Sequence, residues 1–354
     1  MIDHCLALTL ASLDHADILW IVDENMPPET LASIAPDAAR VIMTNRYDIA
    51  DQLQRRGCQV VLSDFDFNAL PDQPRRFSRI VYRISKEKSV VHHCINHAMR
   101  HLAEGGELLL IGGKQDGIKS IGKNAGAAFG CRNAIKKVAT AYRVTLPAVS
   151  GLSDDAWLPD NDYAELRQVQ HGNMTFYSKP GVFGWDKIDK GSVLLVGVLP
   201  KVFGDMKGAT SVLDLGCGWG YLMLATRDMD IARRVAVDNN MAAVAAARRN
   251  FSDAGLTVET LADDAGSQLR ERFDLLLCNP PFHQGFAVSE RLTRHFLAAA
   301  ARVSRRSTRA IFVVNQFIPL ERLAPEYFGS CRLLAEGSGF NVFELRPGSR
   351  HPHD

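Results

Sequence analysis

The chain has 354 residues, of which 46% are hydrophobic and 23% are charged, a balance typical of globular proteins with buried cores. This length is about twice that of a common domain, so we expect two domains. The formal net charge of +1 excludes a polycation, and any affinity for nucleic acid must come from local clusters of basic residues.

The seven cysteines are scattered, and no two have the CxxC spacing of a zinc ribbon. Their odd number disfavours a disulfide framework and favours a reducing compartment. The first residues include Asp3 and lack the basic segment of a secretory signal. No apolar run approaches the ~18 residues of a membrane span. We therefore expect a cytoplasmic protein with no membrane partner and no metal.

The first half of the chain alternates short apolar runs with amphipathic segments, which predicts an α/β domain over residues 1–160. The expected helices are Tyr47–Arg56 and Val90–Leu102. The expected strands are Ile18–Val22, Arg40–Thr44, Gln59–Leu62, Arg79–Arg83 and Glu107–Ile111.

Four histidines fall on the second of these helices: His92, His93, His97 and His101. Three of them have the spacing of one helix face, which could hold a metal. A fixed zinc site normally draws its ligands from more than one segment, and no partner set is visible. We expect a polar helix face instead, which could contact RNA.

A basic stretch follows at 114–143, where seven lysines and arginines oppose the single Asp116, a net charge of +6. A solvated face is the usual reason for such a run. Here the run stands in an otherwise balanced chain, and the same half lacks catalytic motifs, so we expect a surface that contacts the RNA backbone. Arginines within 302–309 would extend it. The lysines expected to bind RNA are Lys119, Lys123, Lys136 and Lys137.

Residues 146–165 are rich in Pro, Asp, Ser and Gly, which predicts an exposed linker. A hairpin that turns at Gly172-Asn173 is expected next, at the start of a second domain over residues 165–354.

The second domain shows a stronger alternation of strands and helices, with the near-continuous apolar runs of buried parallel strands. Two final strands joined by Gly-Ser-Gly predict an antiparallel hairpin at the sheet edge. The expected helices are Asn240–Phe251 and Ala287–Val303. The expected strands are Ser211–Leu215, Arg234–Val237, Val258–Leu261, Phe273–Cys278, Ala310–Asn315, Cys331–Glu336 and Phe340–Arg346.

Two segments of the first half correspond to segments of the second. FSRIVYRISK at 77–86 matches FDLLLCNPPF at 273–282, and HLAEGGELLLIGG at 101–113 corresponds in place to the strand at 310–315. These matches predict an internal duplication. The first copy has lost its chemistry, because it contains neither DLGCG nor NPPF.

The strongest chemical motif is VLDLGCGWGYL at 212–222, where an apolar strand leads through Asp214 to Gly216, Gly218 and Gly220. Glycines at the carboxyl edge of a sheet let a ligand approach the backbone. The dinucleotide fingerprint G-x-G-x-x-G fails because position 221 is Tyr. A glycine turn without a ligand is the alternative.

Acidic residues follow the next two strands. Asp238 lies 24 residues after Asp214, where a carboxylate can accept hydrogen bonds from ribose hydroxyls. Asp263 and Asp264 follow the third strand. In isolation, each of these residues would be read as a turn or helix cap.

The sequence Asn279-Pro280-Pro281-Phe282-His283 follows the fourth strand. The Asn279 side-chain oxygen and the Pro280 carbonyl can each accept one N–H of an exocyclic amine, which aims the nitrogen at a methyl donor. Two prolines stiffen the turn. Phe282 offers a face for stacking a flipped base, worth about 1–3 kcal/mol. A di-proline turn alone is usually structural.

Together these motifs resemble class I S-adenosylmethionine-dependent methyltransferases, and NPPF resembles their [DNS]PP[YFW] motif for amino groups. The resemblance implies two Rossmann-like domains in tandem, the N-terminal one degenerate. It implies Asn279, Pro280 and Phe282 as catalytic residues, and it favours Asp264 over Asp263 because Ala follows. The implied contacts to S-adenosylmethionine are Asp214, Gly216, Gly218, Asp238, Asp264 and Asn279.

Residues 179–346 resemble the ribosomal RNA guanine-N2 methyltransferases of the small-domain type. NPPFH and VVNQFIP at 313–319 carry this resemblance, which implies base contacts from Phe282 and His283. KPGVFGWDKIDKGSVLL at 179–195 resembles the segment that covers the cofactor in that family, and implies outer contacts. These would come from Phe183, Asp189, Gly191 and Ser192.

The implied reaction is methylation of a guanine N2 amine in ribosomal RNA or a ribosomal subunit. IPLERLAPEYFG at 318–329 favours small-subunit (16S) RNA, whereas NPPFHQ also matches the large-subunit enzyme. Protein glutamine and DNA adenine methyltransferases remain alternatives, although they usually have Tyr in place of Phe282. A non-enzymatic assembly factor that holds the cofactor is a further alternative, which the intact NPPF disfavours.

Overall fold

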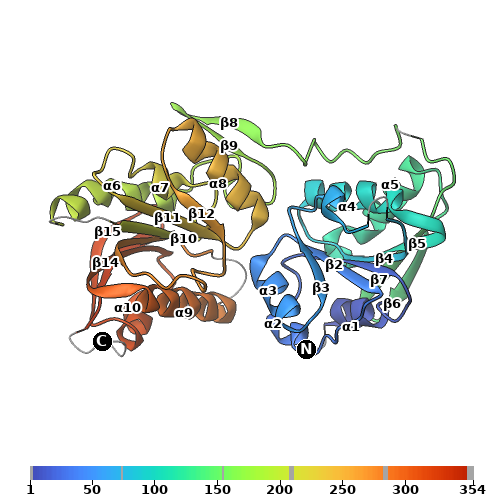
Figure 1. Cartoon of the computed structure of the whole chain (residues 1–354), viewed down its shortest axis with the longest axis horizontal. Helices are drawn as coiled ribbons and strands as arrows, with labels where there is room; N and C mark the ends of the chain where they lie inside the picture. Colours follow the sequence, from blue (N-terminus) through green and yellow to red (C-terminus); the bar gives the residue numbers. More distant parts are fainter. Residues whose placement is uncertain (1–2, 73–74, 154, 207–210, 282–285, 349–354) are drawn as a thin grey trace. The chain divides into compact units, whose positions relative to one another are not determined.

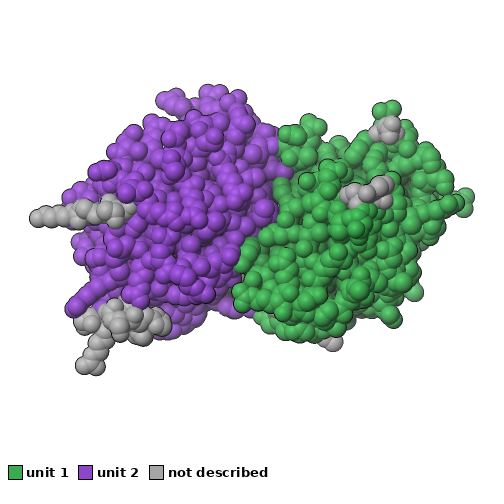
Figure 2. Space-filling model, viewed as in Figure 1, with its two compact units in different colours: residues 1–165 green, residues 166–354 purple. Residues whose placement is uncertain are grey.

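The computed structural model describes residues 3–72, 75–153, 155–206, 211–281 and 286–348. The chain forms two compact units, Met1–Glu165 and Leu166–Asp354 (Figures 1 and 2). Each unit is an α/β structure built on a mixed seven-stranded sheet. The expected tandem of Rossmann-like domains is therefore confirmed. Within the described ranges, no helix is long and apolar enough to cross a membrane.

The sheet of the first unit has the order β3-β2-β1-β4-β5-β7-β6. Strands β1 to β5 are parallel, β7 runs antiparallel to β5, and β6 runs antiparallel to β7. Side chains of β1 alternate between two cores, with Leu19 and Ile21 in one and Trp20 in the other. The strands are β1 (Ile18–Val22), β2 (Arg40–Thr44), β3 (Gln59–Leu62), β4 (Phe77–Arg83), β5 (Leu102–Gly113), β6 (Ala134–Val138) and β7 (Ala141–Pro147).

Helices cover both faces of this sheet (Figure 1). One face carries α4 (Lys88–Arg100) and α5 (Ile118–Ala128), and the other carries α1 (His4–Ala11), α2 (Pro28–Leu31) and α3 (Tyr47–Arg55).

The sheet of the second unit repeats this order as β12-β11-β10-β13-β14-β16-β15. The hairpin that turns at Gly172-Asn173 forms a separate two-stranded sheet, as expected. The predicted hairpin at the sheet edge is also confirmed. The strands are β8 (Arg167–His171), β9 (Met174–Ser178), β10 (Ser211–Leu215), β11 (Arg233–Asp238), β12 (Glu259–Ala262), β13 (Phe273–Cys278), β14 (Ser304–Asn315), β15 (Ser330–Gly337) and β16 (Phe340–Arg346).

The helices of the second unit also form two layers (Figure 1). One layer contains α6 (Lys190–Gly204), α7 (Tyr221–Leu224) and α8 (Met241–Asp253), and the other contains α9 (Phe286–Arg302) and α10 (Leu320–Leu323).

Strand register supports the predicted duplication. Arg79 lies between Ile18 and Glu107 in the first sheet, as Leu275 lies between Val212 and Arg309 in the second. Both sheets also tie the start of the central strand to its neighbour by the same kind of bond. The Ser78 amide donates to Asp17 Oδ2 at 3.2 Å, and the Ser211 amide donates to Asp274 Oδ2 at 3.1 Å.

The register also gives a physical reason why the first copy lacks cofactor chemistry. If Ile18 corresponds to Val212, then Trp20 occupies the position of Asp214. Trp20 is fully buried, so an indole fills the place where the second unit has a carboxylate.

The second part of the basic stretch of the first unit forms a hairpin that the sequence did not predict. β6 and β7 pair antiparallel across the two-residue turn Ala139-Thr140, and Ala139 has a φ of 51°. Such turns normally use Gly or Asn at left-handed positions, so the usual signal was missing.

The expectation of an exposed linker at 146–165 is only partly confirmed, because most of its described residues are exposed but its second half is anchored to the first unit. Leu158 and Tyr163 are buried in the core of the first unit. Asn96 holds the Leu158 backbone in both directions, accepting from its N–H at 2.7 Å and donating to its carbonyl at 2.9 Å. The Tyr163 hydroxyl donates to Asp64 at 2.6 Å. Polar composition concealed these few anchoring side chains.

The same segment covers the histidine face of α4, so the expected polar face that could contact RNA is also wrong. His92 and His93 are buried, and they bond to the carbonyls of Pro159 and Phe65 at 2.9 and 3.1 Å. Burial lowers the pKa of His97 to about 4, which keeps its ring neutral near pH 7.

We predict that Asn96→Ala loosens residues 150–165 from the first unit. The substitution leaves the buried N–H and C=O of Leu158 without partners, at a cost of about 1–3 kcal/mol for each group. Protease cleavage within this segment is expected to accelerate and the unfolding midpoint to fall. Asn124→Ala, at an exposed position of α5, is the control. Equal cleavage rates in the two variants would contradict the anchoring role of Asn96.

Candidate active site

The motif residues of the second unit converge on one edge of its sheet. Asp214 lies in β10, Asp238 ends β11, Asp264 follows β12 and Asn279 follows β13. These four strands are parallel neighbours, so their carboxyl ends share an edge. Ligands of open α/β sheets bind at this edge.

The loop after β10 requires its glycines. Gly216, Gly218 and Gly220 have φ values of 75°, 55° and 96°, in the left-handed region that other residues rarely adopt. A Cβ on Gly220 would also lie 2.6 Å from Phe251 of α8. The loop therefore turns sharply at the edge of the sheet, with Gly216 and Gly218 half-buried.

Asp214 is a buried carboxyl group with no matching charge. It has no solvent exposure, and within the described chain neither of its oxygens accepts a hydrogen bond of good geometry, while the nearby Met223 backbone N–H favours its ionised form. Burial, reinforced by the negative charge of Asp238, raises the pKa of Asp214 to about 8. An arrangement of this kind favours a cationic ligand, because only a positive group would compensate the ionised carboxylate.

Asp238 ties the glycine loop to β11. Its Oδ2 accepts from the Gly218 amide at 2.9 Å, and its Oδ1 accepts from the Asn240 amide at 2.8 Å. The ribose role of Asp238 stays a prediction.

Asp263 and Asp264 have different surroundings. Asp263 is fully buried and closes its own turn by accepting from Ser267 Oγ at 2.6 Å and the Gln268 amide at 3.1 Å. Asp264 is half-buried, and its Oδ1 lies 2.8 Å from His295 Nε2 of α9. Asp264 is thus the more accessible of the two, as its predicted role requires. No spacing in the sequence indicated His295.

Asn279 is held by the N-terminal end of α6. Its Nδ2 donates to Asp189 Oδ2 at 2.9 Å and to Ser192 Oγ at 2.8 Å. Asp189 caps α6 by accepting from the Ser192 amide at 2.8 Å. Pro280 is buried behind Asn279. Phe282 and His283, the predicted base contacts, lie outside the described residues.

A clamp on the glycine loop was not predicted from the sequence. Trp219 stacks on Phe176 of β9, with ring centroids 3.9 Å apart. Asn250 of α8 joins the two segments, because its Nδ2 donates to the carbonyls of Trp219 and Tyr177 at 2.8 Å each. The β8–β9 hairpin therefore fixes the loop from outside the sheet.

Two family models match the chain. Methyltransferase small domain matches residues 173–344, and Methyltransferase small domain N-terminal matches residues 12–149. Ribosomal RNA small subunit methyltransferase C of Chromohalobacter salexigens is 36% identical over 69% of this chain and 70% of its own. The protein of the same name from Mannheimia succiniciproducens is 30% identical over 84% and 85%.

The chain belongs to this small-domain methyltransferase family. The resemblance drawn from DLGCG and NPPFH is thereby confirmed. A 16S rRNA N2 G1207 methyltransferase of T. thermophilus, in complex with AdoMet and guanosine, has the same fold. It aligns with a TM-score of 0.79 at 24% identity and covers 98% of this chain and 92% of its own.

The four lysines expected to bind RNA are exposed on two neighbouring elements of the first unit. Lys119 and Lys123 lie on α5, and Lys136 and Lys137 lie on the edge strand β6. α5 packs against β7, the partner of β6. The lysines thus belong to one folded region.

The proposed extension of this surface through 302–309 is wrong for Arg302 and Arg309. Arg302 donates to the Leu269 carbonyl at 2.9 Å. Arg309 is buried and pairs with the buried Glu344. These side chains hold the second unit together, and Arg306 is the exposed one.

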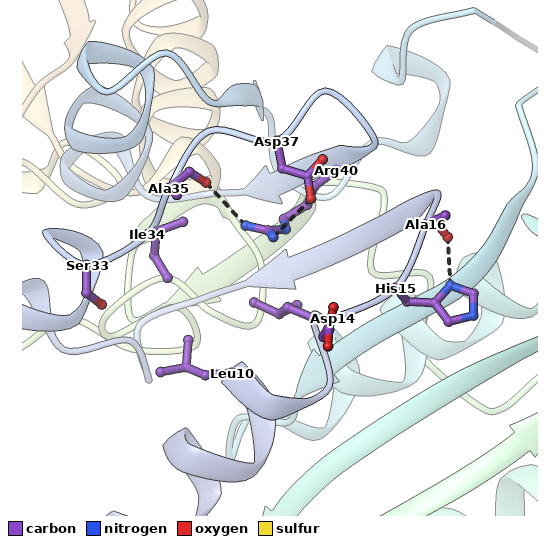
Figure 3. Close-up of a pocket in the computed structure, with 10 residues that line it drawn as sticks. Leu10, Asp14, His15, Ala16, Ser33, Ile34, Ala35, Asp37 and Arg40 are labelled. Atoms are coloured by element: carbon purple, nitrogen blue, oxygen red, sulfur yellow. Dashed lines mark hydrogen bonds and ion pairs between the residues drawn. The ribbon is translucent and has the colours of Figure 1, made fainter.

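A cavity of about 480 Å³ lies in the first unit, at the amino ends of β1 and β2 (Figure 3). His15 and the ion pair of Arg40 with Asp37 line it. Ligands of this fold bind at the opposite, carboxyl edge.

We predict that Asp214→Asn stabilises the ligand-free protein. The folded-state pKa near 8 exceeds the unfolded value near 3.8, so the folded state holds a proton that the unfolded state lacks between these pH values. Stability from this group therefore falls as pH rises from 4 to 8. Asp214→Asn removes this pH dependence and is expected to raise the free energy of unfolding by about 2 kcal/mol or more at pH 8.

Thermal unfolding between pH 5 and 8.5 tests this prediction. The control is Asp228→Asn, whose side chain is 89% exposed. If Asp214→Asn unfolds at the wild-type temperature across the whole pH range, the buried carboxylate does not destabilise the folded protein.

Proposed function

We propose that this protein transfers the methyl group of S-adenosylmethionine to the exocyclic N2 amine of a guanine in small-subunit (16S) ribosomal RNA. The observation that carries the proposal is the state of Asn279. Both donors of its side-chain amide are engaged, which leaves its oxygen to accept from a substrate amine. The names of the relatives agree with this activity.

The edge of the second sheet fits the cofactor. S-adenosylmethionine carries an ammonium and a sulfonium charge, and it supplies an activated methyl group when bound. Asp214 offers a buried carboxyl group whose ionised form would be compensated by such a cation. The glycine loop lacks side chains at Gly216, Gly218 and Gly220 that would keep a ligand from its backbone, while Asp238 and Asp264 offer carboxylate acceptors for ribose hydroxyls and the adenine amine.

The residues of the chain act mainly by alignment. The Asn279 oxygen and the Pro280 carbonyl each accept one N–H, which points the amine lone pair at the methyl carbon. Alignment of this kind supplies a large part of a rate enhancement without a dedicated acid or base. The proton released from the methylated amine passes to solvent. The guanine must be unstacked to reach this edge, and we assign its capture to Phe282 and His283.

We assign RNA docking to the first unit and catalysis to the second, with domains at 1–160 and 165–354. The four exposed lysines support docking, because phosphate contacts need accessible positive charge. A structural role is the competing explanation, since lysines on an edge strand such as β6 also prevent pairing with other sheets.

The activity is tested by incubating the protein with radiolabelled S-adenosylmethionine and separate small subunits, large subunits and free rRNA from a strain that lacks the enzyme. We expect label in small-subunit RNA. Label in large-subunit RNA, in protein or in DNA would replace the substrate assignment, and cofactor binding without transfer to any substrate would favour an assembly factor.

We predict that Asn279→Ala cuts methyl transfer at least about 100-fold, because a misplaced reacting group is that costly. Cofactor affinity, measured by calorimetry, is expected to change little. Turnover close to wild type would remove Asn279 from the mechanism.

We predict that replacing Lys119, Lys123, Lys136 and Lys137 by Ala weakens RNA binding and flattens its salt dependence. Each lost phosphate contact lowers the log–log slope by about one unit. Lys86→Ala with Lys88→Ala, also exposed in the first unit, is the control pair. If the fourfold variant matches wild type in affinity and slope, these lysines serve the edge strand rather than RNA.

A further inference from the structure

We propose that Asp189, with Ser192, is a positioning residue that orients the Asn279 carboxamide and selects Asn rather than Asp at position 279. The proposal rests on the proposed function, because it concerns the acceptor for the substrate amine. It goes further by explaining how the acceptor atom is chosen.

The geometry determines which end of the carboxamide is free. Both bonds from Nδ2 end on oxygens, the Asp189 carboxylate at 2.9 Å and the Ser192 hydroxyl at 2.8 Å. A half-turn of the amide would place the Asn279 oxygen against the Asp189 carboxylate and lose a charge-assisted hydrogen bond. The observed orientation is therefore strongly preferred, and Oδ1 remains the acceptor.

Asp189 is itself held in place. It caps the 15-residue helix α6, where the carboxylate is favoured by the helix dipole and by the Ser192 amide at 2.8 Å. Gly191 lets this turn lie close to β16, because a Cβ there would lie 2.7 Å from the Phe340 ring. Phe340 pairs with Asn315 at the end of β14. The carboxylate is thus fixed by the same sheet that carries Asn279.

This arrangement has a consequence for substitution. The resemblance to amino-group methyltransferases allows Asp at position 279, but an aspartate here would face Asp189 at hydrogen-bond distance. Two carboxylates in contact repel each other. Exchanging the two residue types can restore the donor–acceptor relation. The amide introduced by Asp189→Asn could donate to the carboxylate introduced by Asn279→Asp, which leaves one carboxylate oxygen for the substrate.

The test compares Asn279→Asp, Asp189→Asn and the double variant in the full chain. Asn279→Asp is expected to lower kcat at least about 100-fold with little change in cofactor affinity or in the KM for RNA. Asp189→Asn is expected to lower kcat less, because an asparagine at this position still caps α6. The double variant is expected to have a kcat at least 10-fold higher than that of Asn279→Asp, which corresponds to an activation barrier lower by about 1.4 kcal/mol.

Asp186→Asn is the matched control, since it makes the same change of charge at an exposed position three residues earlier. Its kcat is expected to equal that of wild type. A merely structural role for Asp189 would make the two losses add in the double variant. An additive loss, or an Asn279→Asp variant as active as wild type, would overturn the proposal.

Failure of the proposed function is distinguishable from failure of this inference. If the label enters another amine substrate, the same variants are ranked on that substrate. If the wild type transfers no methyl group, the proposed function fails, and the pairing is read from unfolding midpoints. Recovery of the midpoint in the double variant relative to Asn279→Asp supports the pairing, and a further fall overturns it.

Discussion

The second unit is organised around a buried carboxyl group for which the protein itself provides no positive partner. Asp214 lies in the central strand of a parallel sheet, fully buried, with its pKa raised to about 8 by burial and by Asp238. A buried charge without a partner opposes folding, and such a group persists where a ligand provides the partner. The left-handed glycines and the hydrogen bond from the Gly218 amide to Asp238 fix the conformation of the loop beside Asp214. Asp214 thus lowers the stability of the ligand-free protein, and a bound cationic cofactor would restore that stability.

The first unit shows what the same fold becomes without that charge. The two sheets share a strand order, and their central strands align in register. Trp20 stands where the second unit has Asp214, and Arg83 and Ile84 stand in the stretch where it has Asn279. A buried indole completes the core and removes the need for a ligand. The duplicated unit keeps the architecture, and its exposed lysines on α5 and β6 give it a surface that could serve another purpose.

Local signals in the sequence were enough to place most of the strands and the motif residues, although not the β6–β7 hairpin. Apolar runs located β10 and β13, and a residue that ends a parallel strand must lie at the ligand edge, so Asp238 and Asn279 could be placed before any coordinates. The partners of these residues could not. Asp189 lies 90 residues before Asn279, and His295 lies 31 residues after Asp264. Such pairs depend on how the helices pack on the sheet, and the periodicity of hydrophobic residues in one sequence does not predict that packing. Composition was also a poor guide where a few side chains decide the structure. Leu158 and Tyr163 anchor a polar segment in the core, and Arg309 forms a buried ion pair with Glu344 instead of facing solvent.

The uncompensated carboxylate can be tested directly by counting protons. Calorimetric titration with S-adenosylmethionine at pH 7, in buffers of different ionisation enthalpy, measures the protons released on binding. In the free protein Asp214 is mostly protonated at this pH, and a bound cation lowers its pKa, so the proton must leave. The account predicts release of nearly one proton per cofactor by the wild type, beyond any exchange seen with Asp214→Asn. Equal proton exchange by the two proteins would contradict it.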